Sequence, residues 1–357
     1  MALTVLGVLG LVLRADGRPA GKGRLYISDE RGGNVVVVDP DAGALIARIP
    51  VGKRPRGLVL SADGTKLYVA LSGSPIGGPN VDESKLPPPD RRFDGIGVVD
   101  LRSHRLISTY PSGPDPETFG MSHDGKTLYV SNEDTGKLSS VDLVSGTVRA
   151  TVAVGTEPEG VAVSQDDHLV YVACETADQV YVVDARTMKV LATIATLQRP
   201  RTILLSKDGH TGYVSDEFGS AITVFNAGNQ QVLKTIRVGA ANSPVHPMGL
   251  AASADGRLLY VTTGRAGALL EIDLATGKLL RSIPDVGMRP WGIVLSDDGH
   301  KAYTANGPSG DIAVIDLTSG RVARRIAVGG SPWGIVSSMS STGLKPNARA
   351  DDKGASR

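Results

Sequence analysis

Seven short phrases along the chain place a charged, sulfur-containing or aromatic side chain directly after a proline. Those residues are Arg56, Glu117, Glu159, Arg201, Met248, Trp291 and Trp333. If these positions converge, Arg56 and Arg201 could clamp an anionic group by charge-assisted hydrogen bonds, and Trp291 and Trp333 could stack against an apolar part. The alternative is a set of mutually neutralising ion pairs around a water-filled channel. The residues before the prolines complete the candidate ligand- or partner-binding set with Arg54, Arg199, His246 and Arg289.

Acid–base catalysis has few candidates in this sequence. His246, Glu117 and Glu159 could donate or accept protons. The other histidines lie in or beside expected turns away from this set, at His104, His123, His168, His210 and His300. No grouping has the spacing of a metal site, and no Gly-x-Ser-x-Gly motif is present. We therefore assign no catalytic residue and no metal ligand, and we favour a binding protein over an enzyme.

The elements that must position these residues repeat with the prolines. The spacings from Pro55 through Pro332 are 61, 42, 42, 47, 43 and 42 residues. Each repeat continues with an apolar segment, an Asp-Gly-type turn, a Tyr-Val segment and a β-branched segment that ends in Asp or Asn. Asp-Gly supplies the positive φ of a tight hairpin, and the segments have the length of strands. Four strands in about 42 residues are typical of one β-propeller blade.

The two ends of the repeat predict how the ring closes. Leu25–Ile49 contains the second, third and fourth strands of a blade, whereas Trp333–Ser337 is a first strand with no successor. We therefore predict an all-β, seven-bladed propeller of four-stranded blades over residues 24–337, closed by the C-terminal strand pairing with the N-terminal blade. In a propeller, the loop before each first strand and the loop between the second and third strands open on one face, which holds the candidate residues.

Composition and the chain ends restrict the setting. The formal net charge of +1 argues against general nucleic-acid binding, and the single cysteine, Cys174, excludes an intrachain disulfide. Residues 1–23 contain an apolar stretch of signal-peptide length that is too short to span a bilayer stably. Residues 338–357 are polar and are expected to be disordered. The leader favours a periplasmic location.

Two insertions interrupt the repeat. The longer one, Ser72–Gly95, contains the stiff tripeptide Pro87–Pro89, and the shorter one is Ala240–Val245. Insertions in repeat proteins often lie on the binding face. We interpret the longer insertion as a docking or pocket-forming segment, the alternative being a surface loop without a binding role.

Several motifs resemble a known family. The stretch Tyr129–Asn132, the Gly-x-x-Pro-x-Gly-Val motif at Gly155–Val161 and the Ser-x-Asp-Gly turns resemble YVTN-family β-propellers. The insertion, together with Arg199-Pro-Arg and Arg289-Pro-Trp-Gly-Ile, is most similar to the PQQ-dependent catabolism-associated β-propeller proteins. That resemblance implies a periplasmic role that accompanies PQQ-dependent alcohol oxidation. It links the chain to PQQ only through that pathway and does not imply that the chain itself binds the cofactor.

Three functions follow as hypotheses. The first is a non-enzymatic propeller that binds a small molecule or a partner on its charged face, the partner being a quinoprotein dehydrogenase or its cytochrome. The second is a propeller enzyme of the lactonase or lyase type. The third is a protein-interaction scaffold.

Overall fold

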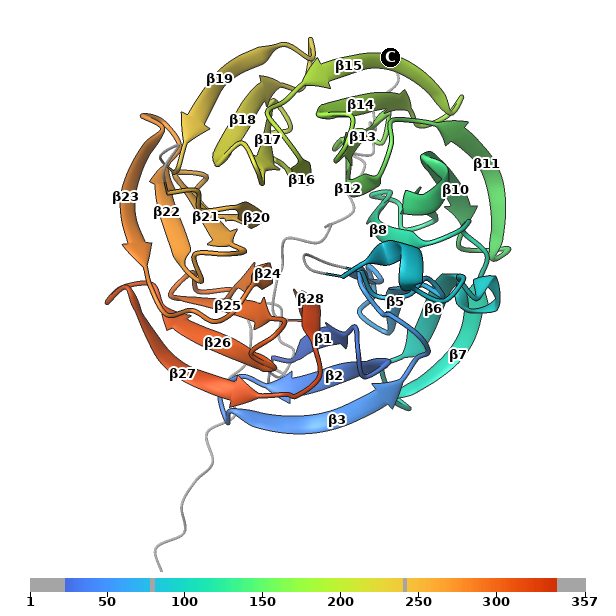
Figure 1. The fold of residues 1–357 in the computed structure, drawn as a ribbon, viewed down its shortest axis with the longest axis horizontal. Coiled ribbons are helices and arrows are strands. Elements are labelled where there is room, and N and C mark those ends of the chain that lie inside the picture. The colour runs from blue at the N-terminus through green and yellow to red at the C-terminus, as the bar shows by residue number, and fades with distance from the viewer. Residues whose placement is uncertain (1–22, 78–80, 240–242, 339–357) are drawn as a thin grey trace, which may run out of the picture.

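The described part of the chain is a closed ring of β-sheets. The computed structural model describes residues 23–77, 81–239 and 243–338. They form seven four-stranded antiparallel sheets around one axis, which confirms the predicted seven-bladed propeller (Figure 1). The expectations for the leader and the tail concern residues that, apart from residue 23 and Ser338, lie outside the described ranges. No helix among the described residues is long and apolar enough to cross a membrane.

In every blade the strands run outward from the axis in the same order. The blades, numbered from the N-terminus and each given from its innermost strand outward, are as follows: first, β28 (Pro332–Ser337), β1 (Leu25–Asp29), β2 (Asn34–Asp39) and β3 (Ala44–Pro50); second, β4 (Leu58–Leu60), β5 (Lys66–Leu71), β6 (Gly95–Asp100) and β7 (Arg105–Tyr110); third, β8 (Pro116–Met121), β9 (Thr127–Asn132), β10 (Lys137–Asp142) and β11 (Thr147–Ala153); fourth, β12 (Pro158–Val163), β13 (Leu169–Cys174), β14 (Gln179–Asp184) and β15 (Lys189–Ala195); fifth, β16 (Pro200–Leu205), β17 (Thr211–Asp216), β18 (Ala221–Asn226) and β19 (Val232–Arg237); sixth, β20 (Pro247–Ala252), β21 (Leu258–Thr263), β22 (Leu269–Asp273) and β23 (Lys278–Ile283); seventh, β24 (Pro290–Leu295), β25 (Lys301–Asn306), β26 (Asp311–Asp316) and β27 (Arg321–Ala327).

The ring closes as the chain ends predicted. Strand β28 pairs antiparallel with β1, in a register that places Leu25 opposite Ser337 and Ile27 opposite Ile335. The C-terminal strand thereby becomes the innermost strand of the N-terminal blade, beside β1 in Figure 1. Closure satisfies the backbone groups that two unpaired strand edges would otherwise expose.

The hairpin turns follow from one repeated hydrogen-bond pattern. In the second blade, the Ser61 hydroxyl donates to the Asp63 carboxylate at 2.6 Å, and the Lys66 backbone N–H donates to the Ser61 oxygen at 2.9 Å. Gly64 takes a φ of +67°, which the turn requires and which glycine adopts without steric cost. In the fourth blade Asp167 occupies the same left-handed position with a φ of +59°.

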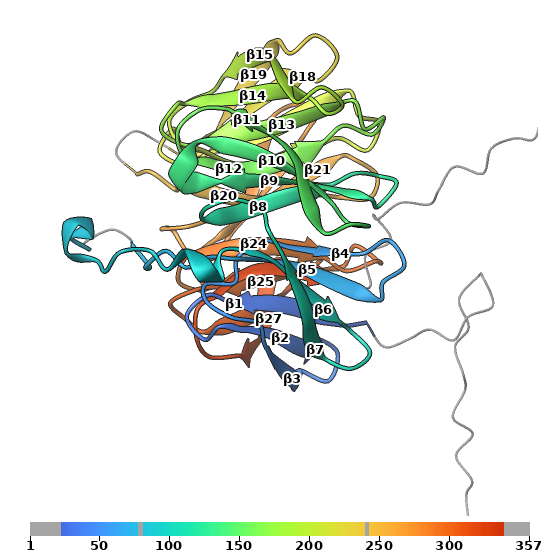
Figure 2. The same cartoon turned by 90° about the vertical axis from the view of Figure 1, so that its right-hand side faces the viewer.

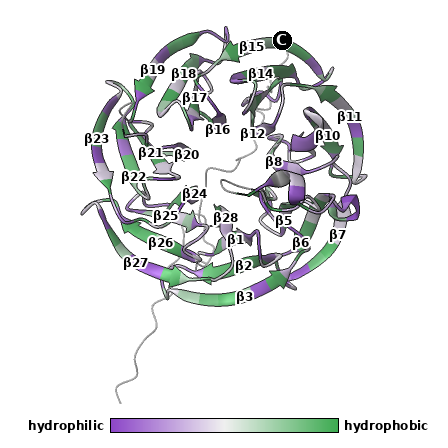
Figure 3. Ribbon diagram, viewed as in Figure 1, coloured by the Kyte–Doolittle hydropathy of each residue, from purple (hydrophilic) through white to green (hydrophobic). Residues whose placement is uncertain are grey.

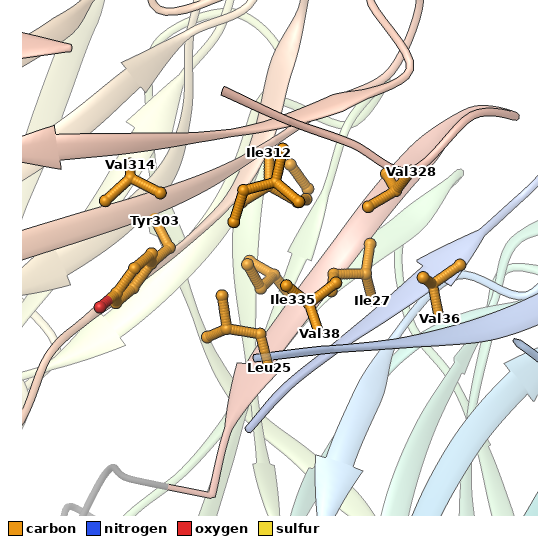
Figure 4. Close-up of a cluster of buried hydrophobic side chains, with 11 residues drawn as sticks. Leu25, Ile27, Val36, Val38, Tyr303, Ile312, Val314, Val328 and Ile335 are labelled. Atoms are coloured by element: carbon orange, nitrogen blue, oxygen red, sulfur yellow. The ribbon is translucent and has the colours of Figure 1, made fainter. Parts of the chain in front are cut away.

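The apolar core lies between blades rather than within one sheet. Figure 4 shows Leu25 and Ile27 of the first blade meeting Tyr303 and Ile312 of the seventh, all of them at most 1% exposed. Figure 3 shows apolar residues concentrated on the strands and polar residues on the connecting loops. Because each blade packs against its neighbours, the inner strands are held rigidly around the axis.

The long insertion between β5 and β6 stands out from one face of the disc (Figure 2). It carries two short 3₁₀ helices, η1 (Glu83–Lys85) and η2 (Arg91–Phe93), and a third, η3 (Glu133–Thr135), follows β9 in the next blade. The insertion is attached to that blade because Arg91 forms an ion pair with Asp134, and the Ser74 hydroxyl donates to Asp134 at 3.1 Å.

Candidate functional site

The seven residues that follow the prolines converge on the axis. A cavity of about 1390 Å³ opens on the face that carries the long insertion, and a narrower channel of about 240 Å³ is lined by the innermost strands. Arg56 and Glu117 line the cavity, and Glu159 and Met248 line the channel. Arg201, Trp291 and Trp333 line both, so these three side chains lie where the two spaces meet.

The backbone at this rim is held by hydrogen bonds between blades. The Ser28 hydroxyl of the first blade donates to the Arg56 carbonyl of the second at 2.6 Å. Ser131 makes the equivalent bond to the Glu159 carbonyl at 2.7 Å, and further bonds of this kind join Ser215 to Met248 and Thr262 to Trp291. In the first, third, fifth and sixth blades, the second strand therefore fixes the rim residue of the following blade.

The residues before the prolines adopt an uncommon backbone conformation. Six of them have φ between 41° and 62°, although none is glycine: Arg54, Asp115, Glu157, Arg199, His246 and Arg289. Such left-handed residues carry a conformational cost of roughly 1–3 kcal/mol each and often occur at functional sites. Five of the six, all except His246, line the cavity.

Arg56 lies at the centre of a buried ion-pair cluster. Its side chain is 2% exposed and contacts Asp115 at 2.6 Å, Glu133 at 3.2 Å and Glu117 at a closer distance. It also donates to the Pro116 carbonyl at 3.0 Å. Arg54 beside it pairs with Glu30 at 3.1 Å and donates to the carbonyls of Ser74 and Pro75 in the insertion.

Arg201 forms a second cluster of the same kind. Its guanidinium group contacts Glu159 and Glu175 through Nη1, and Glu217 through Nε at 2.7 Å. Arg199 contacts Glu175 at 2.7 Å and Glu217 at 3.1 Å. Both clusters therefore match the predicted alternative of mutually neutralising ion pairs, since Arg56 and Arg201 are already bonded to carboxylates.

The two clusters bring four carboxyl groups of neighbouring blades together. We call them the carboxyl arc; its members are Glu117, Glu133, Glu159 and Glu175. Burial raises the pKa of Glu175 to about 10, and the nearby Glu159 adds to that shift. Burial also acts to raise the pKa of Glu159, but Arg201 and hydrogen bonds outweigh it, so the pKa of Glu159 is lowered. At neutral pH this arc therefore holds both a neutral and an ionised carboxyl group.

The other half of the arc is similar. Burial raises the pKa of Glu117 well above its ordinary value, more than Arg56 lowers it. Burial raises the pKa of Glu133 as well. The side chain of Glu133 is 32% exposed, and that of Glu117 only 7%, so Glu133 is the more accessible carboxyl group to a molecule in the cavity.

An aromatic sector faces these charges. The rings of Trp291 and Trp333 stack with centroids 5.7 Å apart and planes inclined by 24°. The guanidinium carbon of Arg289 lies 4.9 Å from the Trp291 ring centroid, and that of Arg201 lies 5.4 Å from it. The Trp291 ring thus contacts both the fully paired Arg201 and Arg289.

Of the residues before the prolines, the structure places Arg54, Arg199 and Arg289 in the cavity lining. His246 is not in that lining. It is buried beside Phe218, with ring centroids 5.6 Å apart, and its Nδ1 lies 3.9 Å from a Glu217 oxygen. Burial, with Arg265 nearby, lowers the pKa of His246, so its imidazole is neutral at pH 7.

The sequence analysis did not place Glu133, Glu175 and Glu217 in the candidate site. All three line the cavity. A signal for them exists in the repeat, because each is the first residue after the second strand of its blade, as Glu30 also is. An acidic residue in the same repeat position of four blades indicates that these carboxyl groups lie on the same face of the ring.

Comparison with known proteins gives partial sequence matches. Residues 96–203 match the protein family described as "Cytochrome D1 heme domain". A curated relative, Antigen Lp49 of Leptospira interrogans serogroup Icterohaemorrhagiae serovar copenhageni, is 28% identical over a match that covers 30% of this chain and 30% of that protein. The chain thus matches less than a third of that relative's length.

Solved structures share the fold over most of the chain. The Pseudomonas aeruginosa periplasmic gluconolactonase PpgL has a TM-score of 0.70 at 22% identity, covering 88% of this chain and 98% of that one. A putative 6-phosphogluconolactonase from Bacteroides fragilis has a TM-score of 0.70 at 16% identity, covering 88% and 97%. Kuenenia stuttgartiensis hydrazine synthase has a TM-score of 0.65 at 18% identity, covering 78% and 88%. These likenesses show a propeller fold; two of the three proteins are named as lactonases or putative lactonases, and none of the three is named as PQQ-associated.

The residues of the cavity do not suit a haem with a protein axial ligand. Axial haem ligands are His, Cys, Met or Tyr, and none of these types lines the cavity. Met248 lines only the narrow channel. Over residues 23–77, 81–239 and 243–338, no group of three or more His, Cys, Asp or Glu is arranged to hold a metal ion.

Proposed function

We propose that this propeller hydrolyses a small lactone in its cavity, with the carboxyl arc moving the protons. The observation that carries the proposal is the coexistence of ionised and neutral carboxyl groups in one arc. Glu175, with a pKa of about 10, keeps its proton at neutral pH, and Glu133 is the accessible carboxyl group. Acid–base catalysis needs one group of each kind.

Each carboxyl group has a role in this reaction. The Glu133 carboxylate accepts a proton from a water molecule whose oxygen attacks the lactone carbonyl carbon. The ring C–O bond then breaks, and the departing alkoxide takes the proton of Glu175. One water molecule is added, and the product is a hydroxy acid. Arg56 positions Glu133 through their 3.2 Å contact, and it also pairs with Glu117 in the same half of the arc.

The similar structures support this choice without deciding it. Two of them are named as lactonases, and one is named as periplasmic. Because one fold serves many activities, the site has to carry the proposal. We propose a periplasmic location for this chain on the same grounds, together with the apolar stretch in residues 1–23.

The proposal is tested with a panel of five- and six-membered sugar lactones. Hydrolysis of each lactone is measured at pH 7 by the acid that it releases. The wild type should hydrolyse at least one of them faster than buffer does. Glu133→Gln should lower kcat roughly 100- to 10,000-fold, the usual effect of losing a catalytic acid or base. Glu157→Gln is the matched control, because Glu157 lines the same cavity but forms no ion pair among the described residues. Equal rates for Glu133→Gln and the wild type would refute the role of the arc.

A second candidate is a binding protein without turnover, accessory to PQQ-dependent alcohol oxidation. The specific observation in its favour is that Pro87–Pro89 of the insertion line the cavity and are exposed, as a docking segment would be. A quinoprotein dehydrogenase or its cytochrome would be the partner. Substitution of all three prolines by serine should then weaken binding of the purified partner, measured by calorimetry. Unchanged binding would exclude the insertion as the docking segment. The same experiment tests the scaffold hypothesis.

A further inference from the structure

The arginines of the cavity fall into two groups. Arg54, Arg56, Arg199 and Arg201 are paired with carboxylates, as described above. Arg31, Arg265 and Arg289 also line the cavity, yet none of them forms an ion pair with a carboxylate in the described parts of the chain. Clustered guanidinium groups without anionic partners repel one another, so this sector carries positive charge that no ion pair neutralises.

Two of these arginines lie against aromatic rings on the side of the sixth and seventh blades. Arg265 follows β21, and its guanidinium carbon is 6.0 Å from the Phe218 ring centroid. Arg289 precedes β24 and lies 4.9 Å from the Trp291 ring centroid. Burial lowers the pKa of Arg289; Arg201 and Arg265 add to that shift, and Glu217 and Glu30 oppose it. Neither of these two carboxylates forms an ion pair with Arg289 in the described parts of the chain.

The cavity is therefore divided by charge. The carboxyl arc belongs to the third and fourth blades, whereas the unpaired arginines and the tryptophan pair belong to the first, sixth and seventh. An anionic group is attracted to the arginines without carboxylate partners, whereas the arginines beside the arc are already paired. The partly exposed indoles of Trp291 and Trp333 lie in the same sector, where a ring joined to that anionic group could pack against them.

We propose that Arg265 and Arg289 form an anion subsite for a carboxylate or phosphate group carried on a sugar-sized ring that packs against Trp291 and Trp333. Guanidinium groups bind both anions by paired hydrogen bonds. The subsite makes the ligand an acidic sugar derivative. As a statement about the substrate it rests on the proposed lactone hydrolysis, but the binding itself does not require turnover.

Tryptophan fluorescence reports on this sector directly, because Trp291 and Trp333 are the two tryptophans of the 357-residue sequence. Three probes with the same ring are compared: glucose 6-phosphate, glucuronate and glucose. We expect a saturable change with at least one charged sugar, weakened by added KCl, and none with glucose. A response to only one of the charged sugars identifies phosphate or carboxylate as the preferred group. Identical responses to all three would overturn the proposal.

Two variants localise the effect. Arg289→Met and Arg265→Met should each raise the Kd of the responding sugar at least tenfold, measured by calorimetry so that altered indole emission does not interfere. Arg289→Lys keeps the charge, so its Kd should lie between those of the wild type and Arg289→Met. Arg186→Met, on an exposed turn between β14 and β15, is the matched control. Wild-type Kd values in both methionine variants would refute the subsite. Charged-sugar binding without lactone turnover would leave the subsite standing and remove the proposed reaction.

Discussion

Replacing Arg201 with methionine keeps an unbranched apolar stem and removes the charged guanidinium group. In the wild type this guanidinium group contacts Glu159, Glu175 and Glu217, and its side chain is 9% exposed. Removing one partner of a buried ion pair typically costs about 3–5 kcal/mol, because the remaining charge stays buried without compensation. Arg199 still contacts two of the three carboxyl groups, so we expect the lower part of that range.

The cost can be measured as a change in melting temperature. Unfolding entropy is roughly 2.1 cal/mol/K per residue, which gives about 0.65 kcal/mol/K for a propeller of about 310 residues. A loss of about 3–5 kcal/mol then corresponds to a decrease in Tm of roughly 5–8 °C. Differential scanning calorimetry of both proteins at pH 7 and equal ionic strength gives this difference.

The pH dependence identifies the cause. Without Arg201, burial should raise the pKa of Glu159 above the ordinary value of 4.5. A carboxyl group whose pKa is higher in the folded state binds its proton more tightly there. The Tm difference between variant and wild type should therefore be smallest near pH 4.5 and grow as the pH rises.

Arg289→Met is the matched control for this experiment. Arg289 lines the same cavity and lies over the same indole as Arg201, but it forms no ion pair among the described residues. Its loss should change stability by about 0.5 kcal/mol or less. Equal Tm losses in the two variants, or a loss in Arg201→Met that does not depend on pH, would refute the ion-pair account of the rim.

Two further predictions concern the scaffold. Ile335 of the closing strand is 6% exposed and belongs to the core between the first and seventh blades, so Ile335→Ala should cost about 2–5 kcal/mol by thermal unfolding. Ile107→Ala on β7, where the side chain is 55% exposed, should be nearly neutral, and equal losses would contradict closure by β28. Burial raises the pKa of Asp216 to about 7 from an ordinary 3.8, so the folded state should lose stability as the pH rises from about 4 to 7. Asp216→Asn, which introduces the residue found in the equivalent position at Asn132 and Asn306, should remove that slope; an unchanged slope in chemical-denaturation curves at several pH values would assign it to other groups.

Repetition in the sequence was sufficient to predict the fold. Prolines at regular spacing and Asp-Gly turns specify blades one at a time, and the incomplete first and last repeats specify closure. Each of these signals is local, so it can be recognised in the sequence without knowledge of contacts between distant residues. The insertion was also predicted on the binding face, and Ser74 and Pro87 do line the cavity.

The pairing of charges could not be predicted in the same way. Arg56 and Arg201 were candidate anion clamps because their repeat positions point to the axis. Which carboxylates reach them depends on the distance between blades, and a glycine illustrates how small that distance is. A Cβ at Gly160 would lie 2.0 Å from the Arg201 carbonyl oxygen. At such separations Glu175 reaches the guanidinium group of the next blade, which sequence spacing does not reveal.

The pH profile of kcat/KM is the measurement that tests the carboxyl arc most directly. With a lactone that the wild type hydrolyses, the account predicts a rate that rises through the raised pKa of Glu133, above the ordinary 4.5, and stays high at pH 8 because Glu175 keeps its proton up to about 10. In Glu133→Gln the rising limb should be absent. A wild-type profile without that limb, or the same limb in Glu133→Gln, would contradict the proposal that this arc performs the hydrolysis.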